Sequence, residues 1–119
     1  MDEPKTPDIV PSRALPDVEQ ERLRQDLKWG QQNHPDGRAG PYCERAEAEA
    51  KQECEEHAAA GTLTWMHILE EEVAEVDACY TAERLRAELV QVAAVAVAWI
   101  ECIDRRAASG EDTFLRKES

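Results

Sequence analysis

One stretch of the sequence, residues 89–100, consists of Leu, Val, Ala, Trp and Ile apart from Gln91. Its most apolar positions, 89, 92, 96 and 100, recur with helical spacing. The stretch is shorter than the roughly 20 residues of a membrane span and is rich in alanine. We therefore expect a helix that is buried on nearly all sides. Since 119 residues support one domain, a second copy of the chain is expected to cover part of this helix, in a homodimer or a tetramer.

Two tetrads lie at equal distances on either side of a predicted turn near Thr81. They are Glu72-x-x-Glu75 before the turn and Glu88-x-x-Gln91 after it. If the two segments are antiparallel helices, a tight hairpin brings the inner residues of the tetrads face to face, and also the outer ones. Four side chains that carry oxygen then converge on one small volume. Hard cations prefer such ligands, so the pattern predicts a site for Mg²⁺ or Mn²⁺.

A helical wheel places Glu72 on the apolar side of its helix. With about 100° per residue, Glu72 falls at about 340° from Trp65, among mostly apolar positions, whereas Glu70 points to solvent. A carboxylate among core positions costs several kcal/mol unless it is paired or bound to metal. The metal assignment accounts for Glu72. Gln91 has a second interpretation, as a core amide that a neighbouring helix satisfies.

The remaining signals predict an all-α protein, because no alternating strand pattern occurs. Residues 1–16 contain four prolines and are expected to form a flexible arm, and residues 111–119 a mobile tail. Residues 17–110 then form one domain, a bundle of about four helices whose last two are an antiparallel hairpin with the metal site. The expected helices run from a cap at Asp17 to Gly30 or Gln32, from Cys43 to about Ala60, from a cap at Thr64, and from a cap at Thr81 to near Gly110.

Charge and cysteine spacing exclude other functions. The formal net charge of −12 disfavours an electrostatic grip on nucleic acid. The chain shows no charged segment followed by an apolar leader, so we expect a cytoplasmic protein without a membrane anchor. Cys54 and His57 lie one helical turn apart, but Cys43 is about 16 Å from Cys54 along a helix, too far for one tetrahedral zinc ion. We expect reduced, half-buried thiols.

The tetrads resemble the motif of the MazG-like all-α nucleoside triphosphate pyrophosphohydrolases, which carry E-x-x-E on one helix and E-x-x-D on the next. The chain reads Glu72-Val73-Ala74-Glu75 and Glu88-Leu89-Val90-Gln91 at these positions. Glu71 completes the E-E-x-x-E form of many members. The resemblance is strongest over residues 65–104, and residues 28–35 look like the segment that lines the base pocket in relatives. Gln91 stands where the family has Asp, which removes one negative ligand from the predicted site.

The resemblance implies hydrolysis of a ribo- or deoxyribonucleoside triphosphate between the α and β phosphates, giving the monophosphate and pyrophosphate. Water is the attacking group. Glu71 or Glu75 would orient or deprotonate this water. The implied metal ion is Mg²⁺, with Mn²⁺ as the alternative, and its expected ligands are Glu72, Glu75, Glu88 and Gln91.

Trp29 and His34 are the expected contacts of the base, and Lys28 and Arg84 those of the triphosphate. Each residue also has an ordinary interpretation, as a core Trp, a His in a turn, or a surface charge. Two other functions stay open. The neutral Gln91 favours a nucleotide-binding regulator without turnover, and the apolar last helix favours a structural helical interaction module.

Overall fold

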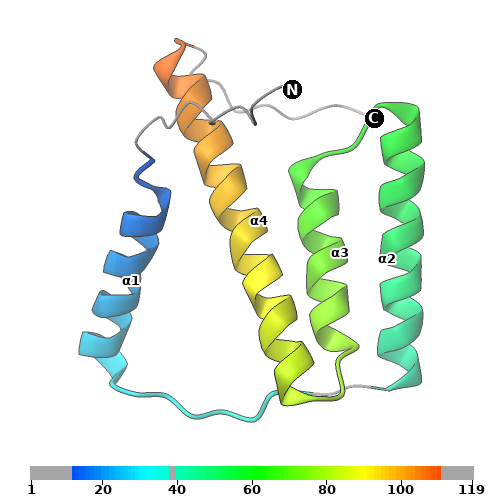
Figure 1. Ribbon diagram of the computed structural model, residues 1–119, viewed down its shortest axis with the longest axis horizontal. Helices are drawn as coiled ribbons and strands as arrows, with labels where there is room; N and C mark the ends of the chain where they lie inside the picture. The colour runs from blue at the N-terminus through cyan, green and yellow to red at the C-terminus, as the bar shows by residue number, and fades with distance from the viewer. Residues whose placement is uncertain (1–11, 38–39, 111–119) are drawn as a thin grey trace, which may run out of the picture. The chain divides into compact units, whose positions relative to one another are not determined.

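The computed structural model describes residues 12–37 and 40–110, which contain four helices and no strand (Figure 1). Helices make up 78% of the described residues, which confirms the predicted all-α class. The chain divides into two compact units between Gln31 and Gln32. Most of the predicted arm and the whole predicted tail lie outside the described residues. The helices are α1 (Ala14–Trp29) in the first unit, and α2 (Pro41–Ala60), α3 (Trp65–Asp77) and α4 (Ala82–Ala108) in the second.

Helix α1 begins four residues earlier than the sequence suggested, because its N-cap is Arg13 and not Asp17. Arg13 occupies the N-cap position, and the Ser12 hydroxyl accepts a hydrogen bond from the Ala14 N–H at 3.2 Å. Pro16 lies in the first turn, where its missing N–H would have had no helical partner. The predicted cap at Asp17, and with it an arm that reaches residue 16, is therefore wrong. Asp17 lies within the first turn of α1, where its negative charge interacts favourably with the positive end of the helix dipole.

Local capping sets the other boundaries close to the expected positions. Gly61 ends α2 in a left-handed conformation with φ 73°. The Thr64 hydroxyl accepts a hydrogen bond from the backbone N–H of His67 at 3.3 Å, and the Thr81 hydroxyl accepts one from the backbone N–H of Arg84 at 3.2 Å. Both predicted caps are therefore confirmed. Helix α2 begins at Pro41, two residues before the expected start, because proline suits the first helical position.

The helices α2, α3 and α4 form a single layer with α3 in the middle and alternating directions (Figure 1). Trp65 at the start of α3 stacks on Trp99 near the end of α4, with ring centroids 6.4 Å apart. The Tyr80 hydroxyl, just after α3, donates to a Glu44 carboxylate oxygen near the start of α2 at 2.9 Å. Each contact joins opposite ends of neighbouring helices, as antiparallel packing requires.

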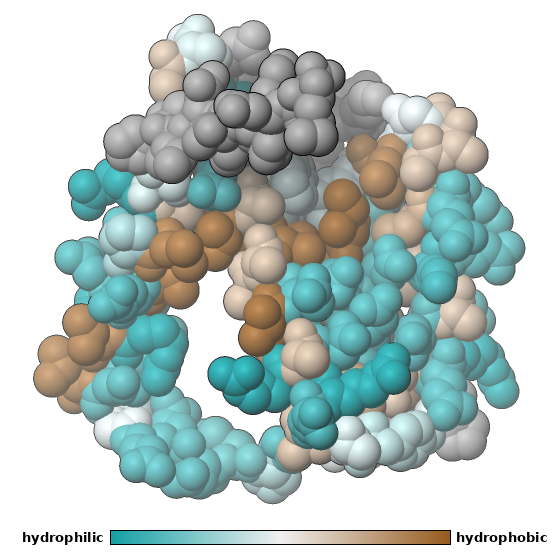
Figure 2. Space-filling model, in the orientation of Figure 1, coloured by the Kyte–Doolittle hydropathy of each residue, from teal (hydrophilic) through white to brown (hydrophobic). Residues whose placement is uncertain are grey.

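This layer leaves α4 largely uncovered. Leu89 and Val90 are 49% and 51% exposed, and no residue of α4 is buried. The expectation of a helix buried on nearly all sides is therefore wrong for the single chain. Apolar side chains also lie at the surface between polar ones on the face shown in Figure 2. None of the described helices combines the length and the apolar character needed to cross a bilayer.

Candidate functional site

Three acidic side chains from α3 and α4 lie together, and we call them the carboxylate cluster. One oxygen from each of Glu72, Glu75 and Glu88 lies within 4.8 Å of the other two. Glu72 and Glu75 are three residues apart on α3, so they share one face of that helix. Glu88 comes from the second turn of α4. The three residues are half-buried, and the antiparallel packing of α3 and α4 brings them across from one another.

Burial raises the pKa values of two members of the cluster. The pKa of Glu75 rises to about 7, mainly because of burial, with further contributions from a hydrogen bond to Glu88 and from the charges of Glu72 and Glu88. Burial also raises the pKa of Glu72. A hydrogen bond with Glu75 acts in the opposite direction, and the charges of Glu88 and Glu71 add to the rise. Without a bound cation, the carboxyl groups of Glu72 and Glu75 therefore stay protonated to a higher pH than exposed carboxyl groups do.

One carboxylate oxygen of the cluster is left without an ordinary donor. Glu72 Oε2 is buried and has no amide, hydroxyl or cationic partner among the described residues. Buried polar atoms normally have partners, so an orphaned oxygen requires an explanation. Three anionic oxygen ligands fit a hard divalent cation such as Mg²⁺ or Mn²⁺, which would satisfy this oxygen.

The two remaining candidates of the predicted site, Gln91 and Glu71, are not part of the carboxylate cluster. Gln91, three residues after Glu88, has an exposed side chain, and its role as a metal ligand stays a prediction. Glu71 lies near Cys54 of α2. Burial, followed by the nearby Glu71 carboxylate, raises the pKa of the Cys54 thiol to about 11. The charge of Glu71 also acts on Glu72, although Glu71 is not one of the three residues of the carboxylate cluster.

The predicted substrate contacts lie on two units of the chain. Lys28 and Trp29 end α1 in the first unit, where the Lys28 ammonium lies 4.8 Å from the Trp29 ring centroid. Trp29 is 57% exposed, so its interpretation as a core residue is wrong. His34 is exposed and hydrogen-bonds to Gln32 at 3.0 Å, and Arg84 is exposed in the first turn of α4. The contact of each with a nucleotide stays a prediction.

The described lining of the pocket at the turn between α3 and α4 does not provide cationic side chains that would bind phosphate groups. Its lining includes the carboxylates of Asp36 and Asp77 and the side chain of Tyr80, and none of its described lining residues is Lys or Arg. A triphosphate needs cationic partners, so this pocket does not suit it without a metal ion.

The sequence did not reveal a second polar cluster at the junction of α2 and α3. It contains Glu53 and His57 from α2 and His67 from α3, and we call it the histidine cluster. The spacing of four residues between Glu53 and His57 was the signal available in the sequence. His67 joins them only because α2 and α3 pack together.

Comparisons of the chain with protein-family models, with curated proteins and with solved structures found no match. The functional assignment therefore depends on the geometry of the carboxylate cluster and on the motif that its residues form.

Proposed function

We propose that the carboxylate cluster binds Mg²⁺ or Mn²⁺ and that the protein hydrolyses a nucleoside triphosphate to the monophosphate and pyrophosphate. The observation that carries the proposal is the convergence of Glu72, Glu75 and Glu88 from two antiparallel helices, with Glu72 Oε2 buried and lacking an ordinary donor. A divalent cation would offset the repulsion among three carboxylates. The type of reaction is inferred from the resemblance of the two tetrads to the MazG-like motif.

The residues of the carboxylate cluster would have different roles in this reaction. Glu72 and Glu88 would hold the divalent ion, and the ion would supply charge screening for the phosphates and for the leaving pyrophosphate. Glu75 would hold the ion with one oxygen and accept a hydrogen bond from the attacking water with the other. Glu71, whose charge acts on Glu72 from outside the carboxylate cluster, is the other candidate for the base that acts on this water.

The test is a panel of the common ribo- and deoxyribonucleoside triphosphates, incubated with Mg²⁺ or Mn²⁺ and followed by product analysis. Pyrophosphate together with the monophosphate is the expected result. Tight nucleotide binding without products would instead support a regulator. Absence of both binding and products would support a structural interaction module.

Gln91→Asp is expected to tighten Mg²⁺ binding and to destabilise the metal-free protein. An added unit charge within about 4 Å of a divalent ion is worth about 2 kcal/mol even at the dielectric constant of water, or roughly a thirtyfold change in affinity. Without metal, the same charge repels three nearby carboxylates. Calorimetry measures the affinity, and thermal unfolding in a chelator measures the stability. Gln91→Asn, which has the size of Asp without its charge, is the control. Unchanged Mg²⁺ affinity in Gln91→Asp would place Gln91 outside the site.

We also propose that a second copy of the chain covers the exposed face of α4, in a dimer or a pair of dimers. Leu89, Val90 and Ile103 are each between 44% and 51% exposed on this helix. Large apolar side chains left exposed on a helix are available for an interface, and most homo-oligomers are built on two-fold symmetry.

Leu89→Glu is expected to shift the protein from oligomer to monomer at low micromolar concentration. A charge buried at an apolar interface costs several kcal/mol, enough to weaken association at least about 100-fold. Light scattering measures the mass. Arg86→Glu, which introduces the same residue at another exposed position of α4, is the control. A wild-type protein that is a well-folded monomer at this concentration would contradict the proposal.

A further inference from the structure

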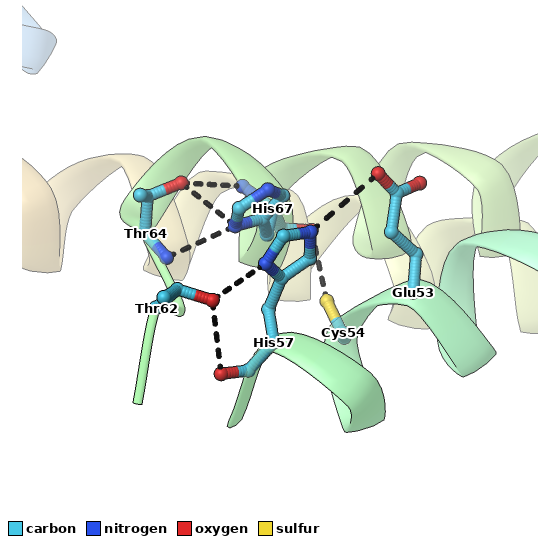
Figure 3. Close-up of polar contacts among 6 residues, drawn as sticks. All are labelled: Glu53, Cys54, His57, Thr62, Thr64 and His67. Carbon is cyan, nitrogen blue, oxygen red and sulfur yellow. Dashed lines mark hydrogen bonds and ion pairs between the residues drawn. The ribbon is translucent and has the colours of Figure 1, made fainter. Parts of the chain in front are cut away.

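The histidine cluster is a second group of metal-ligand side chains, and its chemistry differs from that of the carboxylate cluster. One ligand atom from each of Glu53, His57 and His67 lies within 4.8 Å of the other two. Glu53 and His57 are one turn apart near the end of α2, and His67 is the third residue of α3 (Figure 3). His57 Nε2 lies 4.0 Å from Glu53 Oε1.

Each imidazole has a threonine hydroxyl beside its Nδ1 atom. His57 Nδ1 lies 2.7 Å from Thr62 Oγ1, and His67 Nδ1 lies 2.9 Å from Thr64 Oγ1 (Figure 3). A histidine that binds a metal ion through Nε2 usually donates its Nδ1–H to an oxygen of this kind, which fixes the ring and raises its basicity. Both rings therefore have an outer partner suited to a metal ligand.

The tautomer of His67 depends on what occupies its Nε2. The Thr64 N–H donates to Nδ1 at 3.0 Å, so the neutral ring carries its proton on Nε2. A metal ion at Nε2 moves this proton to Nδ1. The Thr64 hydroxyl can then accept it, because its oxygen already lies within hydrogen-bond distance. When the proton moves to Nδ1, His67 loses the hydrogen bond from the Thr64 backbone N–H and keeps the one with the Thr64 hydroxyl.

The rings must also change their relative orientation. They stack with centroids 4.0 Å apart and an angle of 16° between their planes, so their lone pairs do not point at a common position. The side chains of His57 and Glu53 are 37% and 58% exposed and have room to turn. The backbone N–H of His67 still donates to the Thr64 hydroxyl, which keeps this residue in the first turn of α3. Binding therefore moves the two α2 side chains toward His67.

Cys54 is close to the cluster but is not part of the donor set. Its thiol donates to the His67 carbonyl oxygen at 3.1 Å, and burial is the main reason that its pKa rises to about 11. The thiol therefore contacts the backbone of α3, and its sulfur is not one of the three ligand atoms that lie together.

We propose that the histidine cluster binds one transition-metal ion, Zn²⁺ being the best fit, through the Glu53 carboxylate and Nε2 of His57 and His67. Two imidazoles and one carboxylate, with a fourth position open to water, form a donor set typical of zinc, whereas Mg²⁺ prefers oxygen ligands. The ion joins the end of α2 to the start of α3. Since it binds the folded state, it stabilises the pairing of these helices by mass action. This inference is independent of the proposed hydrolysis.

The test is a titration of the full-length protein with Zn²⁺, followed by calorimetry, and with Co²⁺, followed by visible absorption. Both titrations contain Mg²⁺ in excess to occupy the carboxylate cluster, and one further ion per chain with the spectrum of tetrahedral Co²⁺ is expected. His57→Ala removes one ligand. His67→Gln removes another and keeps an acceptor for the Thr64 N–H, because Gln serves at the third helical position of a capping box. Each variant is expected to weaken Zn²⁺ binding by about tenfold or more, with unchanged helicity by circular dichroism.

Two control variants separate this site from other ligands of the chain. His34→Ala removes the third histidine of the sequence, and Glu72→Gln alters the carboxylate cluster. Both are expected to bind Zn²⁺ with wild-type affinity. The proposal is overturned if wild-type protein binds no stoichiometric Zn²⁺, if His57→Ala and His67→Gln bind it as wild type does, or if Glu72→Gln is the variant that loses it.

Discussion

Glu72→Gln and Glu88→Gln are each expected to abolish triphosphate hydrolysis, with turnover reduced at least about 100-fold, the scale seen when one preorganised electrostatic contact is removed from an active site. The amide keeps the shape of the side chain and one oxygen ligand, but it removes the negative charge that attracts a divalent ion. Pyrophosphate release in the presence of Mg²⁺ measures the activity.

Folding of these variants is expected to be unimpaired. Replacing a half-buried carboxylate by an amide relieves repulsion within the carboxylate cluster, so circular dichroism without metal should match that of wild type. Glu70→Gln is the matched control on α3, because Glu70 is exposed and lies outside the cluster. Wild-type turnover in either Glu72→Gln or Glu88→Gln would refute the metal site, whereas loss of turnover in Glu70→Gln would point to a general effect of charge.

The metal-free protein is expected to lose stability as the pH rises from about 5 to 8. Burial and the neighbouring carboxylates raise the pKa of Glu75 from 4.5 to about 7. Between these values the folded chain holds a proton that the unfolded chain releases. The stability contributed by the neutral carboxyl group is therefore fully present below about pH 4.5 and is lost as the pH rises through 7. Allowing for partial solvent screening, the expected loss is about 2 kcal/mol in the free energy of unfolding, measured by urea denaturation.

Mg²⁺ or Mn²⁺ is expected to reverse this loss. A bound cation favours the ionised carboxylates, so the ion competes with protons and should stabilise the protein more at pH 8 than at pH 5. Glu75→Gln should flatten the dependence of stability on pH in the metal-free protein, and Glu70→Gln should retain it. If Glu75→Gln follows the wild-type pH profile, the cluster does not hold the extra proton.

Short-range chemistry explains why much of the fold could be predicted from the sequence. The caps at Thr64 and Thr81 and the stop at Gly61 depend on groups within five residues of one another, and the structure has all three. The start of α1 was missed because Pro16 was interpreted as part of an extended arm. Proline is compatible with the first turn of a helix, so the spacing of prolines alone did not decide this boundary.

The convergence of the carboxylate cluster was also predictable in part. A short turn between two helices permits essentially one register, so the positions of Glu75 and Glu88 relative to the turn were sufficient to expect that they meet. The sequence did not determine the direction of Glu71, one residue before Glu72. On a helix adjacent residues point about 100° apart, and the packing of α2 against α3 brings Glu71 near Cys54.

Only the tertiary structure decided how α4 is covered and where the histidine cluster forms. The apolar composition of residues 89–100 shows that water should be excluded from them, but burial depends on which surface packs against the helix. In the second unit that surface is α3 alone, which leaves Leu89 and Val90 about half exposed. Likewise, the sequence places Glu53 and His57 one turn apart, and His67 reaches them only through the pairing of α2 with α3. Hydrogen bonds along one helix follow from the order of residues, whereas contacts between helices depend on how their faces pack.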